Sequence, residues 1–555
     1  MINASRILLP VTLVLLASCG GGGGGSSINV PPAASPALPA TEVANAAADG
    51  PLSEREAFRL LQQSTFGPKL DDVKAVAAMG PEAWINQQMA LPGTQLRPTL
   101  LSSRYDRWNE YVNSWWRNAI QADDQLRQRV AFALSQILVV SGANGLGQEQ
   151  EGLTAYYDIL VRHSFGNYRE LLEEVTLNPV MGEYLSMKGN QKPNLDKNIR
   201  PDENYARELL QLFTIGLSQL NPDGTEKLDA EGVPIPAYNQ THVEAFAHVF
   251  TGWHFANADD FRWPSNEDFI NPMLAWPEYH DMGEKKLILG KVLPAGQSAE
   301  EDLKAALDTI FIHPNVGPFI SKQLIQRLVT SNPTPGYVRD VAAVFNKNIN
   351  GERGNLASTV KAILMHSEAR TGHLENPSTF GKTKEPLLRM TQLWRAFPPD
   401  VIHRDFNYAW ATDELQQAPL RSPTVFNFFR PEFSQPGEIA DSGMVSPELQ
   451  ILDENSIITI TSRLAASVLY SNNYNSNPNT KRITINIDRE MQLEPDPDAL
   501  IEHLNNVLLG GQMSEGLKQE VQLLMASRTN KNSASLRVVE AIFLIVSSPE
   551  SSVQI

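Results

Sequence analysis

The fold class of this chain is decided first by residues 53–61, which read SEREAFRLL. Ser53 and Glu56 have the spacing of a capping box, in which the hydroxyl and the carboxylate each accept a hydrogen bond from a free backbone N–H group at a helix start. The apolar residues Ala57 and Leu61 follow at helical spacing. The stretch therefore predicts that an amphipathic helix opens the folded part of the chain.

The same helical period continues to the end of the chain, whereas strand patterns are sparse. We predict a mainly α fold: one large multi-helix globular domain with minor β-hairpins and long ordered loops. The strand candidates are residues 482–487 and 287–289, and the long loops 221–240 and 256–283 are expected to line a functional site. Further helices are predicted at 126–140, 168–177, 203–213, 241–251, 318–329, 337–345, 356–365, 386–397, 447–469, 499–508, 515–525 and 536–546.

Composition excludes several classes of function. The chain has 555 residues and a formal charge of -17, without a long basic run, so it lacks the concentrated Lys and Arg of a nucleic-acid binder. Its single cysteine is Cys19. An intrachain disulfide is therefore impossible, and thiolate catalysis and cysteine-based zinc sites are excluded from the folded body.

The first 50 residues predict export and lipid attachment. A cationic start up to Arg6 and an apolar run at 7–17, too short for the about 20 residues that span a bilayer, are typical of a cleaved signal peptide. The Leu-Ala-Ser-Cys order ending at Cys19 resembles the bacterial lipobox, in which the cysteine is lipidated; the alternative is an ordinary signal peptide with an accidental cysteine.

This assignment predicts three segments: a lipoprotein signal peptide at 1–18, a lipid-anchored linker rich in Gly, Pro and Ala at 19–50, and one helical domain at 51–555. The linker composition cannot bury enough apolar surface to fold by itself. The residue after the cysteine, Gly20, is not the aspartate that resembles an inner-membrane retention signal. The expected location is therefore the cell envelope, with the outer membrane preferred if the organism has one.

Two segments supply candidate binding residues. On the predicted helix at 203–210, Asn204, Arg207 and Glu208 stand at i, i+3 and i+4 and share one side. They could bind a polar ligand, with Glu208 as a general acid, or form an internal ion-pair network, which is the commoner case. In the loop 418–431, Arg421, Asn427 and Arg430 could grip an anionic group, or the arginines could simply neutralise excess carboxylates.

Other candidates are weaker. His280 and Asp281 could form a general base with its orienting carboxylate, although adjacent side chains in a turn usually diverge. His242, His248 and His254 recur every six residues, a spacing that a helix would not bring together at one metal ion. Standard hydrolase, zinc-protease and phosphate-loop motifs are missing. We therefore predict no metal and no cofactor, and whether the chain is an enzyme stays open.

Read in order, these segments resemble the bacterial family called domain of unknown function 1800, of which the chain looks like an exported lipoprotein member. The resemblance implies a mainly helical protein. It also suggests that a second exported protein, similar to sulfatases or alkaline phosphatases, is a partner in the envelope. It carries over neither a reaction nor a catalytic residue. The matching stretches are 57–61, 65–67, 178–182 with 184–185, 203–210 with 213–216, 250–253, 280–281, 287–290, 320–328 and 421–431.

Two hypotheses follow. The first is a lipid-anchored envelope protein that works with an exported partner as a binding scaffold or accessory subunit. The second is a polysaccharide hydrolase or lyase that uses Glu208 with Arg207, Arg421 and Arg430. The second requires Asn204, Arg207, Glu208, Asp281 and Arg421 to converge on one cleft.

Overall fold

The computed structural model describes residues 50–103, 108–399, 402, 406–408, 411–470, 483–527 and 534–555. The predicted signal peptide, Cys19 and nearly all of the predicted linker therefore lie outside the described residues. Helices dominate the described chain, and strands occur there only as three short antiparallel pairs. The mainly α fold with minor β-pairs is confirmed.

The first helix forms as its capping box predicts. The Ser53 side chain accepts a hydrogen bond from the Glu56 N–H, and the Glu56 carboxylate accepts one from the Ser53 N–H at 2.8 Å. The helices of the first half are α1 (Glu54–Ser64), α2 (Leu70–Met79), α3 (Pro81–Ala90), α4 (Leu96–Leu101), α5 (Glu110–Gln121), α6 (Gln125–Ser135), α7 (Gln150–His163), α8 (Tyr168–Leu177), α9 (Pro179–Tyr184), α10 (Asn204–Glu208) and α11 (Gln240–Val249).

Two π-helices continue α-helices: Leu209–Thr214 extends α10, and Ala466–Tyr470 extends α20 (Glu454–Ala465). The helices of the second half are α12 (Ala299–Phe311), α13 (Val316–Leu328), α14 (Pro335–Asn346), α15 (Leu356–Met365), α16 (Ser367–Glu375), α17 (Pro386–Ala396), α18 (Ala411–Leu415), α19 (Glu438–Asp441), α20 (Glu454–Ala465), α21 (Asp488–Leu493), α22 (Pro497–Leu509), α23 (Glu515–Ser527), α24 (Ala534–Ser547) and α25 (Pro549–Ser552).

The strand predictions were only partly right. Residues 287–289 lie in the connection between β3 (Lys285–Lys286) and β4 (Val292–Leu293) rather than in a strand. Of the predicted strand 482–487, residue 482 lies outside the described residues, and residues 483–487 form no strand although their isoleucines are buried. An extended segment can bury alternate side chains against helices without a partner strand. The observed pairs are β1 (Trp253–His254) with β2 (Leu274–Ala275), β3 (Lys285–Lys286) with β4 (Val292–Leu293), and β5 (Lys382–Thr383) with β6 (Val553–Gln554).

An aromatic cluster joins helices that are far apart in sequence. Trp115 and Trp116 on α5 are buried; Trp115 contacts Phe66 edge-on at 5.0 Å between ring centroids, and Trp116 contacts Trp394 of α17 at 5.4 Å. Such edge-to-face pairs add to the stabilisation from burial. The helical aromatic stripe of α5 is therefore a core face, with Trp108, 57% exposed, outside it.

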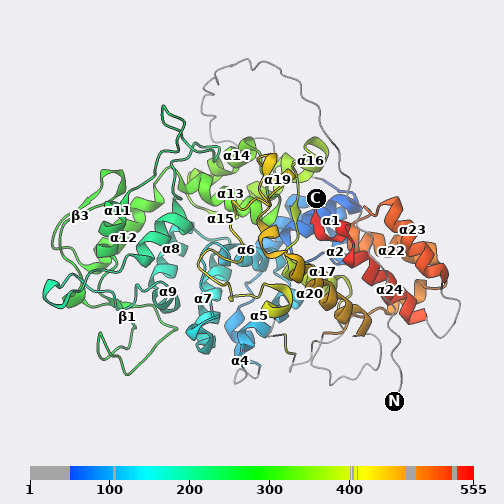
Figure 1. The fold of residues 1–555 in the computed structure, drawn as a ribbon, viewed down its shortest axis with the longest axis horizontal. Coiled ribbons are helices and arrows are strands. Elements are labelled where there is room, and N and C mark those ends of the chain that lie inside the picture. The colour runs from blue at the N-terminus through cyan, green and yellow to red at the C-terminus, as the bar shows by residue number, and fades with distance from the viewer. Residues whose placement is uncertain are drawn as a thin grey trace. The chain divides into compact units, whose positions relative to one another are not determined.

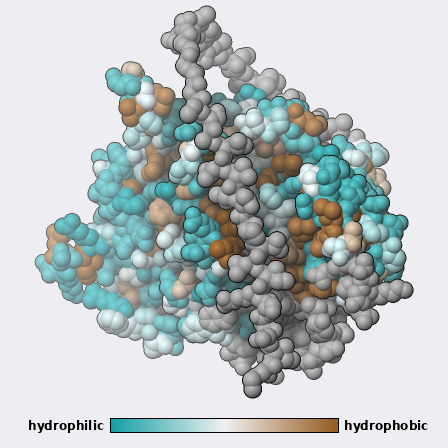
Figure 2. Space-filling model, turned by 45° about the vertical axis from the view of Figure 1, so that its right-hand side comes forward, coloured by the Kyte–Doolittle hydropathy of each residue, from teal (hydrophilic) through white to brown (hydrophobic). Residues whose placement is uncertain are grey.

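The cluster occupies the middle of the helical body. In Figure 1, α8, α9, α11 and α12 gather on the left, α22, α23 and α24 on the right, and α1, α5, α6 and α17 between them. On the face in Figure 2, hydrophilic residues cover most of the visible described surface, and apolar ones occur in small groups. In the part of the chain that the structure describes, no helix has both the length and the apolar character needed to cross a bilayer.

Candidate functional site

A cleft of about 890 Å³ lies between the π-helix at the end of α10, the loop that follows it, helices α13 and α14, and the loop at 425–432. Its volume is in the range of pockets that bind small molecules or peptide side chains. α13 and α14 pack side by side (Figure 1). The cleft is therefore lined by a pair of packed helices, by the π-helix and by two loops.

The π-helix forms the first wall. Its last turn is wide, since the Ile215 N–H donates to the Leu210 carbonyl at 3.0 Å, a separation of five residues. This turn directs Gln211 and Leu212 into the cleft. π-Turns are rare, and they are frequently found at functional sites.

The loop after the π-helix forms the second wall. Asn315, at the start of α13, holds it through its side chain: Oδ1 accepts from the Leu220 N–H at 2.9 Å, and Nδ2 donates to the Ser218 carbonyl at 2.8 Å. The apolar Leu217 and Leu228 line the cleft while remaining 60% and 55% exposed. The loop predicted at 221–240 thus contributes its first part to a cleft.

The loop at 425–432 forms the third wall and carries two predicted binding residues, Asn427 and Arg430. Asn427 has a left-handed backbone, with φ of 65°, and its side chain is 6% exposed. Its Nδ2 has no hydrogen-bond partner among the described residues. The Arg430 side chain is 52% exposed and lies 3.8 Å from the Glu432 carboxylate, so water weakens that pair.

Gln136 and Arg327 form the floor of the cleft, and both are buried. The Arg327 guanidinium donates to the carbonyls of Gln136 at 3.0 Å and Gln323 at 3.1 Å, and the Gln136 amide donates to the Glu385 carboxylate at 2.6 Å. Arg327 Nε and Gln136 Oε1 have no partner in the described part of the chain. Both atoms are shielded from solvent.

Behind the floor lies a buried charge network. Lys382 Nζ is 2.9 Å from the Glu448 carboxylate, and the Arg129 guanidinium donates to the Arg327 carbonyl at 2.6 Å. Burial lowers the pKa of Arg327 to about 10, so its guanidinium stays charged at neutral pH, and burial raises the pKa of Glu448. With Glu385, the network holds three cationic side chains and two carboxyl groups.

Glu208 is buried beside this region but does not line the cleft. Its side chain is 6% exposed, and Oε2 has no hydrogen-bond partner among the described residues. Burial raises its pKa, opposed by the nearby Arg207, and its carboxylate helps to raise the pKa of Tyr184 and of Tyr238. A buried carboxyl with a raised pKa is the form that a general acid takes.

The other residues of the predicted polar face point elsewhere. Arg207 is 41% exposed at its side chain and pairs with Glu203 at 2.6 Å rather than with Glu208, and it also donates to Gln240. Asn204 is exposed. The predicted face is therefore divided: its ion pair lies on the surface, and Glu208 faces the interior.

His280 and Asp281 diverge. Asp281 is hydrogen-bonded to His248, which lowers the pKa of Asp281 to about 2. His280 is fully buried and bonds the Thr251 carbonyl at 2.9 Å and Asp302 at 3.1 Å. The histidine that pairs with Asp281 is thus not its sequence neighbour, and neither residue lines the cleft.

Arg421 is also turned away from the cleft, although it belongs to the same loop as Asn427. Its guanidinium donates to Asn109 Oδ1 at 2.8 Å and to the Tyr111 hydroxyl at 3.3 Å, and so ties the loop to α5. Asn204, Arg207, Glu208, Asp281 and Arg421 are therefore not brought to one cleft. Within the described ranges, no three His, Cys, Asp or Glu side chains are grouped as metal ligands.

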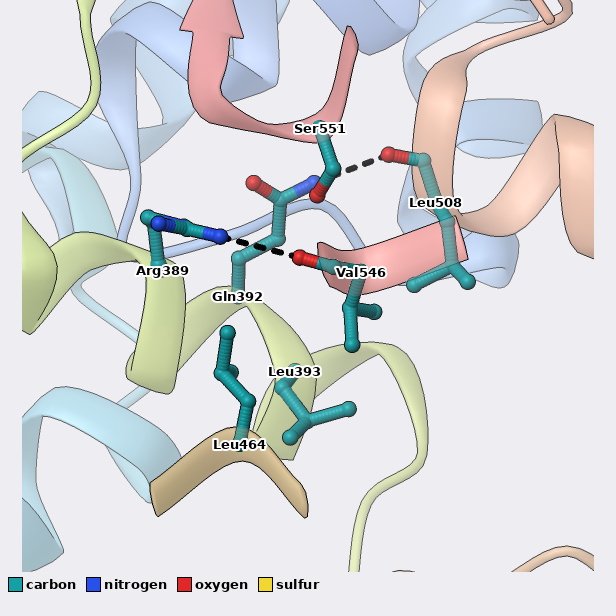
Figure 3. Close-up of a pocket in the computed structure, with 7 residues that line it drawn as sticks. All are labelled: Arg389, Gln392, Leu393, Leu464, Leu508, Val546 and Ser551. Atoms are coloured by element: carbon teal, nitrogen blue, oxygen red, sulfur yellow. Dashed lines mark hydrogen bonds between the residues drawn. The ribbon is translucent and has the colours of Figure 1, made fainter. Parts of the chain in front are cut away.

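A second, far smaller cavity is lined by Arg389, Gln392, Ser551 and apolar residues (Figure 3). Arg389 donates to the Val546 carbonyl and Gln392 to the Leu508 carbonyl, so its polar groups hold the helices together. Its volume is about 10 Å³. Such a space holds one water molecule at most, so it is no ligand site.

A family model described as "Protein of unknown function (DUF1800)" matches residues 59–553, which is most of the chain. The chain belongs to this family. Comparison with curated proteins and with solved structures finds no match. In this DUF1800 protein, the segments 203–216 and 421–431, on which the sequence resemblance partly rests, meet at the cleft through the π-helix and the Asn427 loop.

Sequence reasoning missed the floor of this DUF1800 cleft. Gln136 and Arg327 lie in or beside helices that were predicted, but no pattern in the sequence shows that they meet. The available signal was their polarity: a glutamine after the apolar run of α6, and an arginine between Ile325 and Leu328 on α13, where an amphipathic helix would place apolar residues.

Proposed function

We propose that this DUF1800 protein is an exported, lipid-anchored envelope protein that serves as a binding scaffold or accessory subunit, and that the cleft receives a segment of its exported partner. One observation carries the proposal: the cleft of about 890 Å³ presents the exposed apolar side chains of Leu217, Leu228 and Phe426. Exposed apolar side chains that gather in one place on a surface are typical of a site that binds another protein.

The partner class that we propose is an exported protein similar to sulfatases or phosphatases, as the family resemblance suggests. A hydrolase or lyase acting on polysaccharide is the second candidate. It is favoured only by Glu208, whose buried carboxyl has a raised pKa and an unpaired oxygen. The scattered positions of Arg207 and Arg421 favour the scaffold instead, because substrate contacts must converge.

The scaffold hypothesis is tested by a pull-down of the exported partner. Detergent-solubilised membranes that contain the tagged chain should yield a stoichiometric exported partner. Replacing Phe426, which lines the cleft and is 44% exposed, by Ser should reduce that recovery about tenfold, since losing a central aromatic contact costs on the order of 1.4 kcal/mol or more.

Trp263, 86% exposed and outside the cleft, supplies the control as Trp263→Ser. A parent chain that elutes as a clean monomer without any partner would contradict the scaffold. Glu208→Gln separates the two candidates: it should leave recovery unchanged if the chain is a scaffold, and abolish polysaccharide cleavage if it is an enzyme.

Lipid attachment is tested at Cys19. In Cys19→Ser cells the chain should move from the membrane fraction to the soluble fraction and migrate differently on gels, because the sulfur that carries the lipid is gone. Ser18→Ala, which retains the cysteine, is the matched control. Membrane partition and mobility equal to those of the parent chain would show that no lipid is attached there.

A further inference from the structure

We propose that the junction of residues 382–384 with α17 and with residues 552–554 is a proton-sensitive joint, which the uncharged amine of Lys384 keeps closed and a proton on that amine loosens. This inference goes beyond the proposed function and does not depend on it. It is carried by the burial of Lys384, by the neutral partner of its amine, and by the contacts that meet at this place.

Lys384 differs from the other buried lysines of the described chain. Three lysine side chains there are at most 4% exposed: Lys285, Lys382 and Lys384. Lys285 Nζ lies 2.6 Å from the Asp302 carboxylate, and Lys382 Nζ lies 2.9 Å from the Glu448 carboxylate. Lys384 forms no ion pair with any described residue. A buried ammonium without a carboxylate is costly, so this position favours the neutral amine.

The surroundings of the Lys384 amine give a charge little support. The amine donates to Gln392 Oε1 of α17 at 3.0 Å, and a neutral amide oxygen offsets only part of the cost of burying an ammonium. Gln392 also lines the cavity of about 10 Å³ in Figure 3, which is too small to hydrate a charge. Burial, with a smaller effect from the like charge of Arg389, lowers the pKa of Lys384 to about 7.

The carboxylates on the neighbouring segments are bonded elsewhere. Glu385, which follows Lys384 in sequence, accepts from two glutamine amides at 2.6 Å, and Glu550 of α25 accepts from a backbone N–H at 2.9 Å. Helices α22 and α24 present backbone carbonyls, which accept from Gln392 and Arg389. Among the described residues, the charged group that acts on Lys384 is therefore the cation Arg389.

Lys384 lies where β5 meets β6. Its N–H donates to the Ser552 carbonyl at 2.8 Å, beside the β5–β6 pair. The Gln554 amide of β6 donates to the carbonyls of Leu328 and Val329, at 2.8 and 3.1 Å, where α13 ends. Because α13 lines the cleft, loosening the joint removes support from one wall of the cleft.

The direction of the effect follows from where the proton binds. When the joint opens, the Lys384 amine meets water and regains its ordinary pKa of 10.5, so opening takes up a proton at any pH between about 7 and 10.5. Opening therefore becomes about tenfold less favourable for each unit by which the pH rises in this range. Below about pH 7 the amine is charged in both states. The joint is thus most stable at alkaline pH and loosest at acidic pH.

Denaturant unfolding of the purified chain at pH 8 and at pH 9 tests this linkage. Lys384→Met removes the titrating amine and keeps an apolar stem. The unfolding constant of the parent, divided by that of Lys384→Met, should fall about tenfold from pH 8 to pH 9, because the other ionisable groups contribute equally to both chains. Lys286→Met is the control: its side chain is 77% exposed in the parent, and the variant should keep the parent's pH dependence.

Hydrogen exchange in the parent chain locates the effect and requires no substitution, so it decides if Lys384→Met fails to fold. After correction for the intrinsic pH dependence of exchange, the amides of Lys384 and β6 should be at least tenfold less protected at pH 6 than at pH 8.5. Unchanged protection there would overturn the joint. So would equal pH dependence of unfolding in the parent and in Lys384→Met, or an equal loss of that dependence in Lys286→Met.

Discussion

Replacing Lys382 by methionine is expected to lower the free energy of unfolding by about 3–5 kcal/mol. Lys382 and Glu448 are 4% and 1% exposed, with 2.9 Å between ammonium and carboxylate, and Lys382 Nζ also donates to the carbonyls of Gln326 and Arg327. Its loss leaves a buried carboxylate unpaired and removes a tie to the last turn of α13. Denaturant unfolding followed by circular dichroism measures the change.

The double variant Lys382→Met with Glu448→Leu is the control. Removing both charges with apolar groups of similar volume should restore most of the lost stability, because the cost arises from the unpaired charge rather than from missing attraction. A double variant as unstable as the single one would show that the two carbonyl bonds of Lys382, and not the ion pair, hold this region together.

Replacing Trp116 by alanine is expected to lower the free energy of unfolding by about 3–5 kcal/mol. Trp116 is 0% exposed and contacts Trp115, Trp394 and Tyr408, so truncation leaves a cavity where three elements meet. The midpoint of thermal or denaturant unfolding should fall strongly. In Trp116→Phe the midpoint should fall less, because phenylalanine fills more of the cavity than alanine does.

Trp263→Ala is the matched control, since this side chain is 86% exposed. Its effect should stay within about 0.5 kcal/mol, as for surface substitutions in general. A Trp116→Ala chain as stable as the control would mean that the aromatic cluster repacks and does not brace α5 against α17.

Helices with strong local patterns were predictable from the sequence. The structure has α8 and α15 at the predicted bounds, 168–177 and 356–365, because a capping residue and an apolar face define each of them locally. The same rule should have found α12, whose Ser298 and Glu301 form a capping box, but it was missed. Residues 483–487 were wrongly predicted as strand because alternating burial does not reveal whether a partner strand exists.

The candidate site was predictable only in its parts. Asn427 and Arg430 line the cleft as candidate binding residues, yet Arg421 in the same loop faces α5, and no local pattern distinguishes these directions. Asp281 pairs with His248 of α11, which is distant in sequence, rather than with its neighbour His280. Contacts between residues distant in sequence decide the site, and a single sequence does not contain them explicitly.

The π-helix at Leu209–Thr214 has a consequence for related chains. A π-turn contains about one residue more than an α-turn, and one residue turns a helix by about 100°. Deleting a single residue here would leave an α-turn and change the direction of Gln211 and Leu212 relative to the rest of the cleft. Relatives with the same segment length should therefore share the cleft, and relatives one residue shorter should have lost it.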